Sequence, residues 1–240
     1  MILSTKQIKS LRMKMKILSI GKTLHHDGLD ITSIEASSLP EHHDIELYTY
    51  VIINGGDGTI RRVLKQLHAL DHMPIFILNP TGSFNVVAKI HRAPKIEKVL
   101  DALANGETPK TQKHHLFKLN DEIFLFSAGN MGDLQHIFLS ETLRFGLLKQ
   151  GILKYILSVL FLLPVHLIMT PLMLLSSTRF FIFTPARFIK KFGSFYGEVK
   201  EMTIDLENEY NMLELDGDII TIHGRHLHIK QAGNVPVVTQ

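Results

Sequence analysis

The chain contains the stretch Asn54-Gly55-Gly56-Asp57-Gly58-Thr59 between two apolar segments. The preceding segment, 50–53, is a short apolar run, and the following one, 60–67, has apolar residues at helical spacing. A strand that ends on glycines and continues as a helix brings backbone N–H groups and the positive helix N-terminus to one point. Glycines at 55, 56 and 58 let an anion approach the main chain without a Cβ in the way. The stretch therefore predicts a phosphate site.

Asp57 is the one acid inside this predicted phosphate cradle. A carboxylate there repels phosphate unless a cation lies between them, which indicates a Mg²⁺-nucleotide site with Asp57 orienting the metal, either directly or through water. The alternative is a tight strand–helix turn in which Asp57 and Thr59 only cap the helix.

The first half of the chain alternates between apolar strands and amphipathic helices. We expect strands over 15–21, 29–34, 47–53 and 74–78, and helices over 60–70 and 94–105. This order predicts an α/β domain over 15–110, with a mainly parallel sheet and helices on both faces.

The second half follows a different pattern. A turn at Asn120-Asp121 separates two apolar runs, 115–119 and 123–127, and short alternating runs return from residue 198 onward. We therefore expect a β-rich domain over 111–240, interrupted by an apolar helical segment over 142–193.

That segment contains 24 consecutive residues without Asp, Glu, Lys or Arg, between Lys154 and Arg179. Residues 155–175 are long enough to cross a bilayer, but Pro164 and Pro171 interrupt them. Three interpretations stay open: interfacial helices, buried core helices and a true span. A single span would put the two halves of a β-rich domain on opposite sides of the membrane, which argues against it. Phenylalanines mixed with Arg and Lys up to residue 192 suit an anionic membrane surface.

Composition narrows the possible chemistry. The chain has no cysteine, which excludes disulfides, thiolate catalysis and cysteine-based zinc sites. Several of its 14 histidines are adjacent pairs that cannot share one ion on a strand, and of His223, His226 and His228 only the last two share a strand face. The basic arm 1–14 can bind anionic lipid or nucleic acid, or can be a solvated helix; we expect a lipid surface and no nucleic-acid partner.

A second loop, Asn79 to Ala88, follows the apolar strand over 74–78 and contains Pro80, Gly82, Ser83 and Asn85. Two such loops in one parallel layer meet at the carboxyl edge of the sheet, where ligands bind in these folds. The two loops together therefore predict one nucleotide crevice.

The two loops together resemble the catalytic domain of the diacylglycerol and sphingosine-type lipid kinases. Residues 55–59 match the family's Gly-Gly-Asp-Gly-Thr loop, and Pro80, Gly82 and Asn85 match its second loop, with Ser83 in place of the usual threonine. The sequence Leu215-Asp216-Gly217-Asp218 resembles the family's Asp-Gly-Glu, whose last carboxylate is the general base. The resemblance covers 15–140 and 198–240.

The chain departs from the family pattern at several positions. Arg61-Arg62 replaces the family's Asn-Glu, Val86 stands where aspartate is common, and the glycine-rich strand and Asp-Asp-Gly turn of the second lobe have no match. We therefore expect no structural metal at that turn.

The resemblance implies an ATP- and Mg²⁺-dependent kinase of a membrane lipid, in the cytoplasm at the inner face of the membrane. Gly55, Gly56, Asp57, Gly58, Thr59, Gly82, Ser83 and Asn85 would hold the nucleotide, and Asp57 and Asp218 would be catalytic. Two alternatives stay open. One is an inactive membrane-associated relative that binds nucleotide or lipid; the other is NAD kinase, which shares the first loop but whose second loop fits residues 80–88 poorly.

Overall fold

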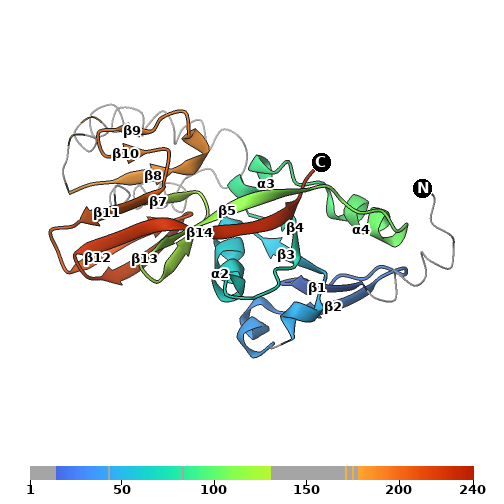
Figure 1. The fold of residues 1–240 in the computed structure, drawn as a ribbon. Coiled ribbons are helices and arrows are strands. Elements are labelled where there is room, and N and C mark those ends of the chain that lie inside the picture. The colour runs from blue at the N-terminus through green and yellow to red at the C-terminus, as the bar shows by residue number, and fades with distance from the viewer. Residues whose placement is uncertain (1–14, 43, 83, 131–170, 172–174, 176–177) are drawn as a thin grey trace, which may run out of the picture. The chain divides into compact units, whose positions relative to one another are not determined.

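The computed structural model describes residues 15–42, 44–82, 84–130, 171, 175 and 178–240. The basic arm 1–14, Ser83 and most of the apolar segment lie outside the described residues. The chain divides into two compact units, one formed by 1–117 with 232–240 and the other by 118–231 (Figure 1). The units are described separately below.

The first unit is built on a largely parallel sheet. Its strands lie in the order β2-β1-β3-β4-β14-β5, and β1 pairs in parallel with β2 and β3, as β4 does with β3 and β14. The strands are β1 (Lys16–Ile20), β2 (Asp30–Ile34), β3 (Tyr50–Gly55), β4 (Ile75–Pro80), β5 (Thr111–Leu119) and β14 (His226–Val238). The four strands predicted for this half are confirmed.

The helices of this unit are α2 (Asp57–Leu67), α3 (Val86–Ile90) and α4 (Ile96–Ala104), with 3₁₀ turns η1 (Ala36–Glu41) and η2 (Ile45–Leu47). The apolar face of α4 packs against the side of the sheet that carries Ile17, Ile52 and Ile77. Strand alternation directs Leu18 and Val51 to the opposite side, and both are fully buried there. The sheet is thus covered on both faces, as its continuous apolar strands predict.

In the residues that the structure describes, the second unit is almost entirely β-structure. A six-stranded sheet has the order β13-β12-β7-β8-β10-β9, and β11 pairs with β14 antiparallel. Its elements are β6 (Glu122–Phe124), β7 (Ser127–Gly129), β8 (Phe181–Phe183), η3 (Thr184–Ala186), β9 (Lys191–Phe192), β10 (Phe195–Tyr196), β11 (Glu201–Asp205), β12 (Tyr210–Leu215) and β13 (Asp218–His223). The mixed α/β and β-rich architecture is therefore confirmed.

Two features differ from the sequence expectation. Sequence patterns placed one boundary near 110, whereas residues 232–240 return to the first unit because the end of β14 pairs with β4 at Val237. The helical character expected for 142–193 is not confirmed, because the part described without a break, 178–193, holds the strands β8 and β9 of the six-stranded sheet and the short 3₁₀ turn η3. In the part of the chain that the structure describes, no helix is long and apolar enough to cross a bilayer.

The chain on the two sides of residues 131–177 lies close together. Strand β7 before this stretch and strand β8 after it are antiparallel neighbours, with Gly129 opposite Phe181. Asn130 ties the ends together, because its side-chain amide donates to the Thr178 carbonyl at 2.7 Å and its Oδ1 accepts the Phe180 amide at 2.8 Å. The chain therefore enters and leaves the stretch 131–177 at one point of the sheet.

Candidate functional site

The first predicted loop joins β3 to α2 at the carboxyl edge of the sheet (Figure 1). Gly55 has no room for a side chain, since an added Cβ would lie 2.5 Å from the Cβ of Thr59. Gly56 is the N-cap of α2, and among the described residues no side chain caps this N-terminus. The first-turn amides and the positive end of the helix dipole are thus oriented for an anion.

The second predicted loop packs directly on the first through two glycines. A Cβ added to Gly82 would lie 2.8 Å from the Cα of Gly56, closer than real side chains come. Asn85 adopts a left-handed conformation (φ 49°), and its Oδ1 accepts the Gly82 amide at 3.1 Å. The structure therefore brings the first loop together with Gly82 and Asn85 of the second loop, as predicted. Ser83, expected to contact nucleotide, lies outside the described residues.

The Asp57 carboxylate joins the two loops. Its oxygens accept the amides of Val86 at 2.8 Å and Val87 at 3.0 Å, which are the first two residues of α3. The side chain is only 7 % exposed. Asp57 therefore begins α2 and caps α3, a role that its sequence position does not predict. Each carboxylate oxygen has a further lone pair, so the group can also accept a hydrogen bond from water.

A buried polar network beneath the loops was missed by sequence reasoning. The side-chain amide of Asn54 donates to Ser19 Oγ at 3.0 Å and to the Ile20 carbonyl at 2.9 Å. Asn79 donates to Asn54 Oδ1 at 2.7 Å. These contacts tie the carboxyl ends of β1, β3 and β4 together. The signal was an asparagine directly after each of two apolar strand runs.

The adjacent arginines Arg61 and Arg62 differ in burial and in position on α2. Arg61 is buried on α2, whereas Arg62 is exposed and its Nη2 donates to Thr59 Oγ1 at 3.4 Å. The Thr59 hydroxyl, expected to contact nucleotide, therefore faces a cation at the start of α2. A cation beside an anion site favours phosphate binding.

In the second unit, Asp216 and Gly217 form the turn between β12 and β13. Both have positive φ (52° and 91°), which is the geometry of a two-residue hairpin turn. The Asp216 carboxylate is buried and accepts the amides of Leu125, Phe126 and Ser127 at 2.7, 2.9 and 3.0 Å. Asp218 begins β13 opposite Leu215 and is half-buried. Asp216 is thus a structural acid, whereas Asp218, expected as the general base, lies half-buried at the start of β13.

Burial raises the pKa of Asp216 from 3.8 to about 7, with the nearby Glu214 charge acting in the same direction and the three amides acting against it. The protonated form is therefore favoured by folding. The stability that it contributes is complete below the ordinary pKa and is lost as the pH rises through about 7. Glu214 is itself buried and accepts the Ser127 hydroxyl at 3.1 Å.

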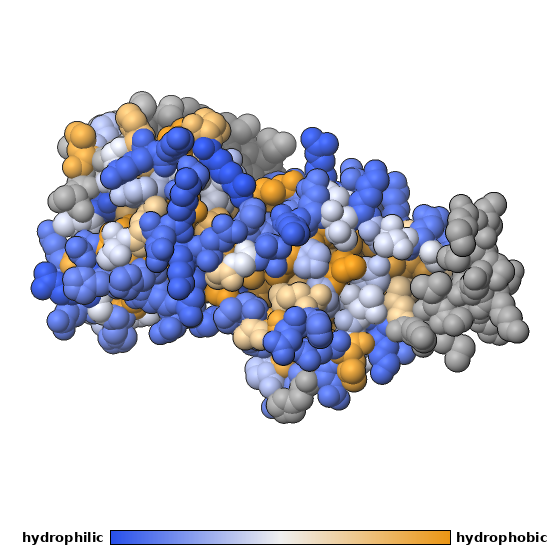
Figure 2. Space-filling model, viewed as in Figure 1, coloured by the Kyte–Doolittle hydropathy of each residue, from blue (hydrophilic) through white to orange (hydrophobic). Residues whose placement is uncertain are grey.

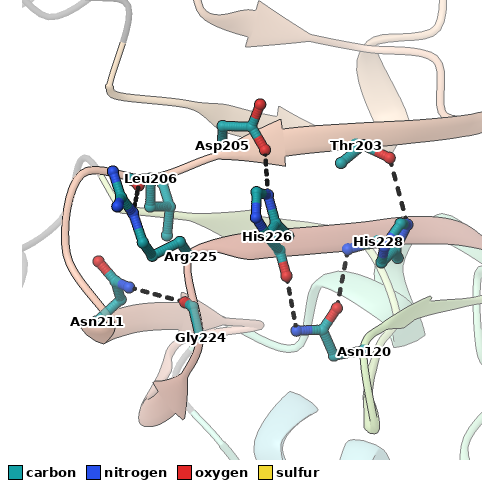
Figure 3. Close-up of polar contacts among 9 residues, drawn as sticks. All are labelled: Asn120, Thr203, Asp205, Leu206, Asn211, Gly224, Arg225, His226 and His228. Carbon is teal, nitrogen blue, oxygen red and sulfur yellow. Dashed lines mark hydrogen bonds and ion pairs between the residues drawn. The ribbon is translucent and has the colours of Figure 1, made fainter.

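The histidine pair on β14 forms cross-strand contacts with β11. His226 Nδ1 lies 2.6 Å from Asp205 Oδ1, and His228 Nδ1 lies 3.3 Å from Thr203 Oγ1 (Figure 3). Asn120 contacts the backbone of both histidines from the other side (Figure 3). The prediction that these two share a strand face is confirmed. Within the described ranges, no three His, Cys, Asp or Glu side chains gather as metal ligands do.

The part of the chain that carries both loops matches a known protein family. Residues 6–115 match the model of the family described as "Diacylglycerol kinase catalytic domain". The match contains both loops and stops before Asp218. The resemblance to this kinase family, predicted from the loops, is confirmed for that part of the chain.

Two similar proteins illustrate the match. A Streptococcus pneumoniae serotype 4 protein named "Putative lipid kinase" is 27% identical over 124 residues, which cover 50% of this chain and 41% of that protein. The chain thus aligns with less than half of that relative. A crystal structure of a diacylglycerol kinase from Bacillus anthracis str. Sterne has a TM-score of 0.57 at 12% identity, covering 95% of this chain and 97% of that one. This second likeness shows a shared fold.

Proposed function

We propose that this chain, whose residues 6–115 match the diacylglycerol kinase catalytic domain, transfers the γ-phosphate of ATP to the hydroxyl of a membrane lipid. The observation that carries the proposal is the contact between Gly56 and Gly82, which joins two phosphate-type loops at one sheet edge. Asp57 supports it by holding the second loop through the amides of Val86 and Val87.

The nucleotide side of the mechanism follows from the first loop. Amides at the start of α2 and the Thr59 hydroxyl would hold the ATP phosphates, with Gly82, Ser83 and Asn85 adding contacts at the second loop. Bound Mg²⁺ would neutralise phosphate charge. Each Asp57 carboxylate oxygen already accepts a hydrogen bond from a backbone amide. The carboxylate therefore fits a metal held through its hydration water better than one bound directly.

Asp218 is the proposed general base. It would accept the proton of the lipid hydroxyl while that oxygen bonds to the γ-phosphorus and the bond from phosphorus to the β,γ-bridging oxygen breaks, releasing ADP. Asp216 supports the turn by holding three amides of the segment 125–127, so it positions Asp218 without taking part in the chemistry.

A lipid acceptor requires that the enzyme reach the membrane. We propose that residues 155–192, and the basic arm 1–14, bind an anionic surface, which would place the protein at the cytoplasmic inner face. The absence of acidic residues from 142 to 197 of the sequence supports this partner.

An inactive relative that binds nucleotide or lipid is the second candidate, and the capping role of Asp57 favours it. A carboxylate that holds two loops together has a structural reason to be present whether or not phosphate is transferred. NAD kinase is the third candidate.

The proposal is tested by incubating the purified full chain with γ-³²P-ATP, Mg²⁺ and a total lipid extract, and in parallel with NAD. A labelled lipid that disappears in Asp218→Asn supports the proposed reaction, with the exposed Asp121→Asn as the matched control. ATP binding without any labelled product would select the inactive relative, and labelled NADP would select NAD kinase.

A further inference from the structure

Among the described residues of the second unit, the loop and hairpin over 184–197 carry the most exposed phenylalanine and tyrosine side chains. Phe188 is 86 % exposed in the loop after η3, and Phe192 is 66 % exposed on the edge strand β9. The surface over β8 to β10 shows hydrophobic residues directly beside strongly hydrophilic ones (Figure 2). Large apolar groups rarely stand this far out of a folded surface unless they meet a partner.

These phenylalanines are presented by a rigid support. Gly197 lies so close to the loop that an added Cβ would overlap the carbonyl oxygens of Ala186 and Ile189. The Ile189 amide donates to the Ala186 carbonyl at 2.9 Å, and β9 pairs with β10, Phe192 opposite Phe195. Strand β10 is in turn held by β8. The exposure of Phe188 and Phe192 is therefore built into the fold.

The charges around the two rings have one sign. Arg187 directly precedes Phe188, and Lys190 and Lys191 stand between the two phenylalanines; all three are exposed, and Lys191 Nζ lies 5.1 Å from the Tyr196 ring centroid. The sequence from 142 to 197 contains seven Lys and Arg and no Asp or Glu. Cations interleaved with exposed aromatic rings complement an anionic lipid surface, where rings enter the headgroup layer and cations meet lipid phosphates.

A second copy of the chain fits this surface poorly. Strand β9 has two residues, too few for a stable edge-to-edge ladder, and lysine on an edge strand opposes pairing. Two such surfaces would also bring like charges together.

We propose that the segment 187–192 inserts Phe188 and Phe192 into the headgroup region of an anionic bilayer. The inference deepens the proposed function. It rests on that function only for the reason why the chain would meet a membrane, and the contact itself is argued from the surface.

The chain has no tryptophan, so a single substitution supplies a unique reporter. The full-length Phe188→Trp protein is mixed, without ATP, with vesicles of equal parts phosphatidylcholine and phosphatidylglycerol. We expect a blue shift of the emission and quenching by lipids brominated along the acyl chain. The matched control, Tyr210→Trp, lies on an exposed strand position of the same unit and should show neither change.

A binding measurement completes the test. Lys190→Gln with Lys191→Gln should weaken cosedimentation with the same vesicles about 25-fold, on the order of fivefold per cation, whereas Lys95→Gln with Lys98→Gln should not. Unchanged Phe188→Trp emission in protein that does cosediment would overturn the inference, because another segment would then make the contact. A Phe192→Ser variant that turns a dimer into a monomer would assign the surface to a second copy. No outcome depends on turnover, so a failed kinase assay leaves this result readable.

Discussion

Replacing Asp57 by asparagine tests the link between the two loops. The carboxylate accepts two amides from α3 and is almost fully buried, so both bonds are formed away from water. Asparagine has one acceptor oxygen, and its NH₂ group would face the other amide. One charge-assisted bond is lost, which costs about 1.5–3 kcal/mol. The lost negative charge at the N-terminus of α3 adds about 0.3–1 kcal/mol.

The expected total is therefore about 2–4 kcal/mol, concentrated on α3 and the second loop. Amide hydrogen exchange measures this directly, because each 1.4 kcal/mol corresponds to about a tenfold change in protection. We expect the amides of Val86 and Val87 to exchange about 30-fold or more faster, while β1 and β3 stay protected. Nucleotide affinity should fall in parallel.

The matched control is Glu97→Gln. Glu97 is also an acid in the first turn of a helix, α4, but it is exposed. Its replacement should change stability by less than about 1 kcal/mol. If the Val86 and Val87 amides of Asp57→Asn kept wild-type protection, the bonds from Asp57 would not hold the loop, and the reasoning would be refuted.

Three further predictions concern the same framework. Gly82→Ala should lower affinity for a fluorescent ATP analogue at least tenfold, because its Cβ would lie 2.8 Å from Gly56 Cα, whereas the exposed Thr81→Ala should bind normally; equal affinities would contradict the loop contact. Asn54→Ala should cost about 2–3 kcal/mol in urea unfolding, since it leaves Asn79 and Ser19 without their buried partner; a loss below about 1 kcal/mol would show that the network adds little. Wild-type stability should fall as the pH rises from about 4 to about 7, by up to about 4 kcal/mol from Asp216 alone, and Asp216→Asn should remove that part of the slope; an identical slope in the variant would show that Asp216 is not the titrating group.

The nucleotide half of the site was largely readable from local patterns. Glycines 55, 56 and 58 after an apolar run, and Gly82 after the next strand, imply two loops at one edge of a parallel sheet, because parallel strands end at a common edge. The contact between Gly56 and Gly82 is the direct consequence. The roles of Asp216 and Asp218 were harder to predict. The two acids lie two residues apart, but Asp216 is buried against the amides of residues 125–127, whereas Asp218 is half-buried at the start of β13.

In the first half of the chain, the sequence by itself determined the order of the main strands and helices and the position of both phosphate-type loops, because apolar periodicity and glycine placement are local properties of the chain. Tertiary structure alone decided what each polar side chain does. Asp57 meets amides 29 and 30 residues away, and Asp216 meets amides about 90 residues away. Such partners are chosen by how strands and turns pack, and no spacing along the chain records them.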